Sequence, residues 1–207
     1  EESGRCFCWG REFSQVDAAT DDVSGSLDGL LAPLMRRMSG FPAPTFAAVQ
    51  GACLGVGLGL LVASDVVYVS DDAKFGSPFA ALGAALDSGG HSLFVERLGA
   101  HRTLDLIYTG RFMSGAEAVA SGLFSRSMPP DELLPTTMDA ASTAARGPTA
   151  AFVASKNLIA RMREERLVGW EALAAENAVQ LELRETADFR EGFTAFQEHR
   201  TPEFLGR

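Results

Sequence analysis

A stretch without a single charged side chain, Met38 to Ser64, constrains the fold of this chain more than any other feature. It is long enough to cross a bilayer, but two prolines interrupt its start and four glycines punctuate the rest, which is unfavourable for a helix that faces lipid. We therefore expect two buried elements joined by a turn, a strand at 45–49 and a small helix at 57–63. The glycine-rich turn between them leaves backbone amides accessible.

The remaining pattern predicts an α/β fold with a helical C-terminal part, because short apolar runs come early and helical periodicity comes late. A buried strand is expected at 66–70. Helices are expected at 27–38, with Pro33 as a kink or in the first turn, and at 90–98, 101–108, 114–122, 148–166, 170–181 and 188–200. Ser114 and Glu117 have the spacing of a capping box.

The last of these helices carries an aromatic stripe of Phe189, Phe193 and Phe196. We interpret the stripe as core packing in preference to a dedicated ligand site. Together with the apolar face of 170–181 it exceeds what a short helical tail can bury on itself, which favours assembly into a trimer or a dimer of trimers.

Charge and composition exclude several classes of partner. The chain has 18 basic and 27 acidic residues, a net charge of −9, so we expect no nucleic-acid and no membrane partner.

The three cysteines form no C-x-x-C pair, and the three histidines lie in no metal-ligand spacing, so no metal is expected. The first residues lack the features of a signal peptide, and a reduced, cytoplasmic setting is the expectation.

Two glycine-containing turns, residues 7–13 and 51–57, carry the chemical signal. Such turns direct backbone N–H groups outward together, which suits a phosphate or a developing oxyanion. The second turn matches neither the dinucleotide-binding nor the P-loop pattern, so nucleotide binding loses its main support.

These turns and the segments around them resemble the crotonase (enoyl-CoA hydratase/isomerase) superfamily, in the family's order along nearly the whole chain. The matching segments are Phe7-Cys8-x-Gly10, Pro44-Thr45, Ala47 to Gly51, Leu54-Gly55-x-Gly57, Ala63-Ser64-Asp65, Ala73 to Gly76 with Pro78, Leu82-Gly83, Gly89-Gly90, Thr109-Gly110-Arg111, Ala116-Glu117-Ala118, Gly122-Leu123, Lys156, Glu191-Gly192, Ala195-Phe196 and Arg200-x-Pro202.

The resemblance implies a spiral of β-β-α turns over residues 1–145 and a helical trimerisation region over 146–207. It implies an acyl-CoA substrate, no cofactor beyond the coenzyme A of that substrate, and an enolate oxygen held by the amides of Arg11 and Val56. Adenine is expected beside the backbone of Trp9, and the coenzyme's phosphates beside backbone and arginines such as Arg11. Family members generally have several dozen residues before the first turn, so we expect the N-terminal strands to be missing.

The resemblance breaks down at the two glutamates that hydratases use. Their positions hold Gly59 and Phe79 here, which argues against water addition by a glutamate pair. Asp87 is the remaining acid in a suitable place, because several isomerases of the family have a catalytic aspartate in this loop. The dihydroxynaphthoyl-CoA synthases of the family also keep an aspartate there, with a serine downstream like Ser92. A helix cap is the competing interpretation of Asp87, and His91 is either an assisting group or a surface residue.

Three functional classes follow. We favour an enoyl-CoA isomerase or lyase in which Asp87 shifts a proton. The second class is a dehydratase or decarboxylase acting on a carrier-protein-bound polyketide thioester, since the turn Phe7 to Phe13 also resembles polyketide β-branching dehydratases. The third is a non-catalytic acyl-CoA-binding subunit.

Overall fold

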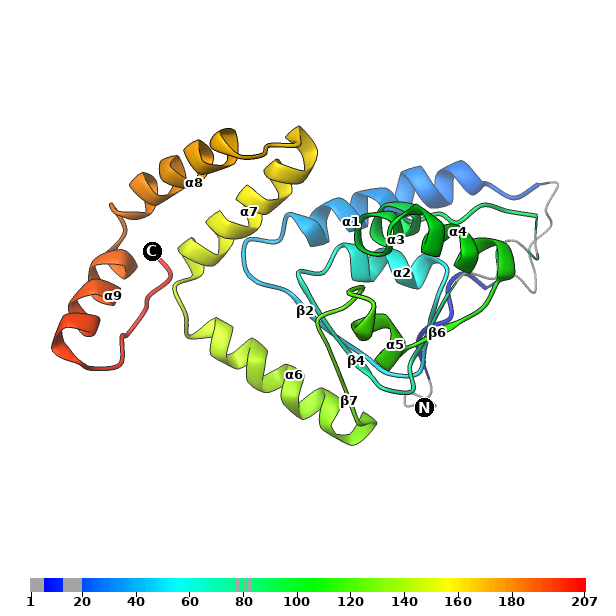
Figure 1. Cartoon of the computed structure of the whole chain (residues 1–207), viewed down its shortest axis with the longest axis horizontal. Coiled ribbons are helices and arrows are strands. Elements are labelled where there is room, and N and C mark those ends of the chain that lie inside the picture. Colours follow the sequence, from blue (N-terminus) through cyan, green and yellow to red (C-terminus); the bar gives the residue numbers. More distant parts are fainter. Residues whose placement is uncertain (1–5, 13–19, 77–78, 80, 82) are drawn as a thin grey trace. The chain divides into compact units, whose positions relative to one another are not determined.

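The computed structural model of the chain describes residues 6–12, 20–76, 79, 81 and 83–207 (Figure 1). The chain divides into two compact units. The first runs to Thr137 without Pro42–Pro44, and the second consists of Pro42–Pro44 and Met138–Arg207. The division therefore falls inside the helix α6 (Pro130–Ala145), whereas the sequence analysis places it after residue 145.

The strands of the first unit form two sheets. One sheet has the order β1-β3-β5-β6, and the other has the order β2-β4-β7. Neighbouring strands are parallel except for the antiparallel pair β5 and β6. The strands are β1 (Cys6–Cys8), β2 (Phe46–Val49), β3 (Ala52–Leu54), β4 (Val66–Ser70), β5 (Lys74–Gly76), β6 (Met113–Ser114) and β7 (Arg126–Met128).

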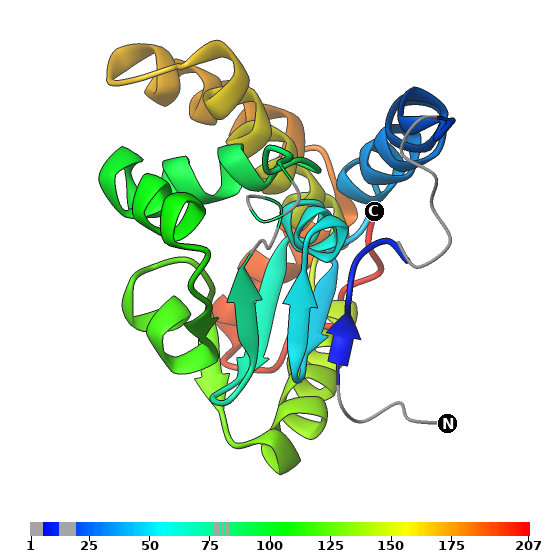
Figure 2. The same cartoon turned by 90° about the vertical axis from the view of Figure 1, so that its right-hand side faces the viewer.

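From β1 to β5, consecutive strands alternate between the two sheets, and this produces the repeating β-β-α path. β2 lies in one sheet, β3 in the other, and α2 (Val56–Val62) follows; β4 and β5 repeat the same alternation. The parallel strands point the same way, with α2 beyond their carboxyl ends (Figure 2). The Asp65 carboxylate accepts the N–H and the hydroxyl of Thr45, at 2.8 and 2.9 Å, and so aligns the starts of β2 and β4.

The charge-free stretch is thus divided among the end of α1 (Ala32–Ser39), β2, β3 and α2. The expected strand and helix are present as β2 and α2, but the strand β3 lies between them, where the sequence predicts only a turn. No helix in the described part of the chain combines the length and the apolar composition that a membrane span requires. Leu58 and Leu61 of α2 are fully buried in the core beside Phe75 and Phe94. Each such side chain contributes about 1.5–3 kcal/mol to folding through the hydrophobic effect.

Five further helical elements lie in the described part of the first unit, before the start of α6. They are the π-helix η1 (Gly25–Leu31), α1 (Ala32–Ser39), α3 (Gly90–Leu98), α4 (Ala100–Thr109) and α5 (Gly115–Ala120). Pro33 lies in the first turn of α1, one of the two expected placements. The Ser114 hydroxyl caps α5 by accepting the Glu117 N–H, while the Glu117 carboxylate pairs with Arg111 instead of closing the capping box.

The second unit is helical. It contains the end of α6 together with α7 (Thr149–Glu165), α8 (Trp170–Leu183) and α9 (Ala187–Glu198). The last three helices match the expected ranges to within a few residues. The sequence analysis does not predict α6, whose sixth residue is Pro135. Pro135 lies beyond the first four residues of α6, whose N–H groups have no acceptor in the helix, so it removes one hydrogen bond, to the carbonyl of Asp131.

Polar contacts hold the C-terminal tail against α9. The buried Asp188 carboxylate accepts the N–H groups of Leu205 and Gly206, at 2.7 and 2.8 Å. The Glu191 carboxylate pairs with both terminal nitrogens of Arg200 and accepts the Glu203 N–H at 2.8 Å. The Arg200 hydrogen bonds, followed by the Glu203 amide, lower the pKa of Glu191 to about 2.

This lowered pKa predicts an acid-sensitive tail. The folded tail favours the ionised carboxylate, so its contribution is complete above the ordinary glutamate pKa of 4.5 and is lost as the pH falls toward about 2. We expect Glu191→Gln to reduce the hydrogen-exchange protection of the Glu203 amide already at neutral pH. Glu176→Gln, at an exposed position of α8, is the control and should leave that protection unchanged. Equal protection in both variants would contradict the assignment.

Candidate active site

The two glycine-containing turns meet at the start of α2. β1 and β3 are parallel neighbours, with Cys8 opposite Cys53, so the turns that follow them lie at the same edge of the sheet. A methyl group built on Gly10 would lie 3.2 Å from the Leu54 carbonyl oxygen and 3.7 Å from the Val56 nitrogen. The residue before Arg11 is therefore in contact range of Val56.

The local backbone explains why amides are available there. Gly55 precedes α2 with φ +51° and ψ −122°, and Gly10 has φ +90°, conformations that glycine adopts readily. Val56 is the first residue of α2, and the first N–H groups of a helix have no acceptor within the helix. Two turns that meet in this way can direct N–H groups at a single oxygen atom.

Phe79 forms an apolar wall beside this turn. Its side chain is only 7% exposed, and its ring lies 3.1 Å from a methyl group built on Gly55. Phe79 stands at one of the two positions where the resemblance expects a hydratase glutamate. The structure thus places a hydrocarbon ring, with no proton to give or take, next to the second glycine turn.

Gly59, at the other glutamate position, supports the loop that carries Asp87. A methyl group on Gly59 would lie 2.7 Å from the Ser88 carbonyl oxygen, 3.0 Å from Ser88 Cβ and 3.1 Å from the Met35 sulfur. There is no room for a side chain at this position. Gly59 lies three residues after Val56 in α2, a rise of about 4.5 Å along the helix axis, so the loop contacts the helix slightly less than one turn after Val56.

Asp87 does not cap α3. The N-cap residue is Gly89, and no side chain makes a capping hydrogen bond there. The Asp87 carboxylate instead accepts a hydrogen bond from the Ser88 hydroxyl at 2.6 Å, and the side chain is half-buried. The helix-cap interpretation of this aspartate is therefore wrong for its side chain.

The Arg11 guanidinium forms a two-pronged ion pair with the Asp21 carboxylate. This hydrogen bonding raises the pKa of Arg11 and lowers that of Asp21. Asp21 lies in the segment Phe13 to Leu27, whose sequence has no regular pattern. The pairing of Asp21 with Arg11 could therefore not be predicted from the sequence. The pair ties the first glycine turn to the segment before η1.

The other candidate residues lie at or near the surface. Trp9 is 65% exposed at the end of β1, and Glu12 is exposed close by. His91, Ser92 and Glu96 are exposed on α3.

Cysteine and metal chemistry receive little support. Burial raises the pKa of the Cys53 thiol, which keeps it protonated at neutral pH. Among the described residues, no three histidine, cysteine or acidic side chains are grouped so that they could hold a metal ion.

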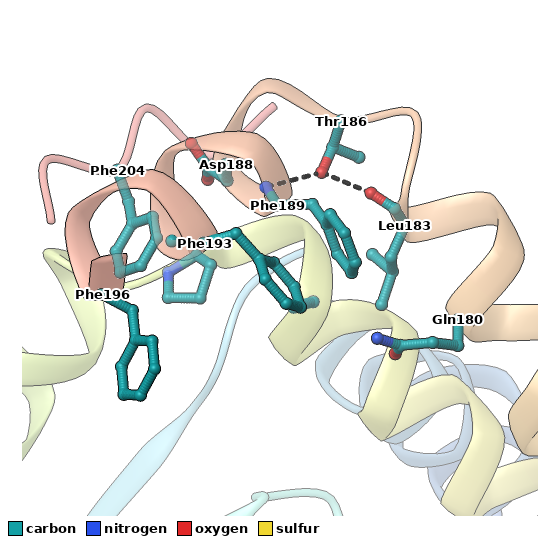
Figure 3. Close-up of a pocket in the computed structure, with 11 residues that line it drawn as sticks. Gln180, Leu183, Thr186, Asp188, Phe189, Phe193, Phe196 and Phe204 are labelled. Atoms are coloured by element: carbon teal, nitrogen blue, oxygen red, sulfur yellow. Dashed lines mark hydrogen bonds between the residues drawn. The ribbon is translucent and has the colours of Figure 1, made fainter. Parts of the chain in front are cut away.

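A separate cavity of about 400 Å³ lies wholly in the second unit (Figure 3). The aromatic stripe lines it, with the Phe189 and Phe193 rings 4.6 Å apart. Phe193 and Phe196 are 56% and 81% exposed, so within the single chain they are not the core residues that the sequence analysis favours. Among the described residues of the second unit, none covers the exposed faces of these two rings.

Comparison with known proteins decides the family. The sequence pattern described as "Enoyl-CoA hydratase/isomerase" matches residues 1–207. The chain belongs to this family.

The similar members of the family include both hydratases and isomerases. A probable enoyl-CoA hydratase of Rhodobacter capsulatus is 34% identical, over 99% of this chain and 79% of that protein. The 1,2-epoxyphenylacetyl-CoA isomerase of Escherichia coli is 30% identical, again over 99% and 79%. Enoyl-CoA hydratase subunit I of Geobacillus kaustophilus superimposes with a TM-score of 0.86 and 31% identity, over 99% of this chain and 78% of that one. Membership therefore establishes the class of enzyme and leaves the individual reaction open.

The contact between Gly59 and Ser88 predicts a stability effect. Gly59→Ala forces a methyl group against a backbone carbonyl and should destabilise the fold by about 1–3 kcal/mol, the usual cost of overpacking. Gly29→Ala is the matched control, because a methyl group there meets nothing within 4 Å. Urea denaturation of both variants measures the difference, and a Gly59→Ala variant as stable as the control would show that the loop does not rest on α2.

Proposed function

We propose that this member of the enoyl-CoA hydratase/isomerase family is an enoyl-CoA isomerase in which Asp87 is the general base. Asp87 removes a proton from C2 of a 3-enoyl thioester, and the electrons of the broken C–H bond pass into a dienolate. The N–H groups of Arg11 and Val56 stabilise the negative charge on the thioester oxygen. Asp87 then returns the proton to C4, which leaves a 2-enoyl thioester without gain or loss of atoms.

The observation that carries this proposal is the packing of Ser88 on Gly59. It excludes a glutamate side chain from α2, and Phe79 replaces the second glutamate, so the pair that would activate water is absent from both of its positions. A proton shift between two carbons of one substrate needs only a single carboxylate. The Asp87 loop contacts α2 slightly less than one turn after Val56, which supports Asp87 in that role.

The roles of Arg11 and Trp9 toward coenzyme A are part of the same proposal. The guanidinium of Arg11 already pairs with Asp21, so a phosphate would have to share or replace that partner. We therefore assign the main contribution of Arg11 to its backbone N–H. The exposed Trp9 at the end of β1 suits contact of its backbone with adenine.

Replacing Asp87 tests the proposal. General-base catalysis typically contributes ~10²- to 10⁴-fold, so Asp87→Asn should lower kcat on a 3-enoyl-CoA by that factor while thioester binding stays nearly intact. Asp72→Asn, in the exposed turn before β5, removes the same charge and should leave kcat unchanged. Formation of the conjugated 2-enoyl product measures the rate, and calorimetric titration measures binding.

Four results would contradict or change the assignment. Full activity of Asp87→Asn, or rapid hydration of crotonyl-CoA by the wild type without isomerisation, would refute the proposed reaction. A strong preference for acyl-phosphopantetheine would favour a carrier-bound substrate. Absence of acyl-CoA binding would favour a non-catalytic subunit.

We also propose that the protein assembles as a trimer or a dimer of trimers. The apolar side chains exposed on the helices of the second unit support this, namely Trp170, Leu173, Leu181, Phe193 and Phe196. Cyclic assembly is a common way to bury such surfaces. Light scattering at micromolar concentration should give three or six times the mass of one chain, and a monomeric mass would contradict the proposal.

A further inference from the structure

The turn that carries Asp87 has an unusual backbone. The Asp87 carbonyl accepts the Gly90 N–H at 2.9 Å, and both residues between them have positive φ, +55° for Ser88 and +78° for Gly89. Turns of this kind favour glycine, asparagine and aspartate at both central positions. Serine at the first of them costs conformational free energy, and strain of this kind clusters at functional sites.

The Ser88 side chain offers a reason for this cost. Its hydroxyl donates a hydrogen bond of 2.6 Å to the Asp87 carboxylate, and both residues are half-buried. Glycine at this position would relieve the backbone but would remove the donor. A hydrogen bond to a charged group is stronger than one between neutral groups.

The body of the fold holds the turn in place. The Ser88 backbone rests on Gly59 of α2, with the Met35 sulfur beside the same point. The Met35 methyl group and both methyl groups of Val62 lie 3.5 Å from a methyl group built on Gly89. α1 and α2 together therefore fix the backbone from which the Ser88 hydroxyl projects.

We propose that Ser88 is a positioning residue, whose hydroxyl holds the Asp87 carboxylate in the direction required for proton transfer. The inference rests on the proposed function, because the hydroxyl has this role only if Asp87 is the base. Ser88 makes no contact with the substrate in this account and acts only through Asp87.

Two variants of the full chain separate the hydroxyl from the backbone. Ser88→Gly accepts the positive φ without strain and should not lower the thermal midpoint, yet it should reduce kcat on a 3-enoyl-CoA by roughly tenfold or more, with KM changed less than about twofold. Ser88→Asn tolerates the same backbone and supplies an N–H donor, so it should recover most of that loss. A Ser88→Gly enzyme with full kcat, or a Ser88→Asn enzyme as slow as the glycine variant, would overturn the proposal.

A double-mutant cycle with Asp87→Asn tests the positioning role of Ser88 separately from the proposed function. If Ser88 acts only through Asp87, Ser88→Gly should have little further effect on kcat in the Asp87→Asn background. An equal loss in both backgrounds would indicate a general structural role and overturn the positioning role. Full activity of Asp87→Asn would refute the proposed function itself, whereas a slow Asp87→Asn beside a fully active Ser88→Gly would refute only the role of Ser88.

Discussion

Close backbone packing around α2 is the constraint on which the rest of the site depends. A methyl group on Gly57 would lie 2.8 Å from Cys8 Cβ, and one on Gly59 would lie 2.7 Å from the Ser88 carbonyl oxygen. The end of β1 and the loop that carries Asp87 therefore contact one short helix directly, because the glycines of that helix have no side chains. Protein interiors are packed densely enough that a single added methyl group is felt. The glycines thus bring the first glycine turn and the loop that carries Asp87 against the same helix.

The same packing concerns position 59, where the family resemblance expects one of the two hydratase glutamates. Restoring the glutamate at position 59 would require the Ser88 backbone to move, and with it the loop that carries Asp87. Position 79 is different, because the Phe79 ring fills space that another side chain could occupy. The two positions therefore differ in kind. A glutamate at position 79 would need only a change of side chain, whereas a glutamate at position 59 would need a different backbone path for the loop that carries Asp87.

The sequence predicted the elements whose signals are local. Charge-free runs, glycine stops and the Ser114 cap predicted the described helices other than α6, and the apolar runs predicted the strands β2 and β4. The other described strands have two or three residues each, which is too short for a recognisable pattern. The helix α6 was not predicted, because Pro135 interrupts its helical pattern. Two interactions could not be predicted, the ion pair of Arg11 with Asp21 and the hydrogen bond from the Ser88 hydroxyl to Asp87. Both depend on the backbone conformation, which the sequence pattern does not encode. The sequence Asp-Ser-Gly-Gly was the available signal for the strained turn, since it joins four turn-forming residues.

The central claim is that Asp87 exchanges a proton with a substrate whose thioester oxygen is held by the two turns. A crystal structure with a bound unreactive analogue of a 3-enoyl-CoA tests it most directly. The account predicts the thioester oxygen within hydrogen-bond distance of the Arg11 and Val56 nitrogens, with the Asp87 carboxylate the nearest acid to C2 and C4. A thioester oxygen bound elsewhere, or another carboxylate nearer to these carbons, would contradict it.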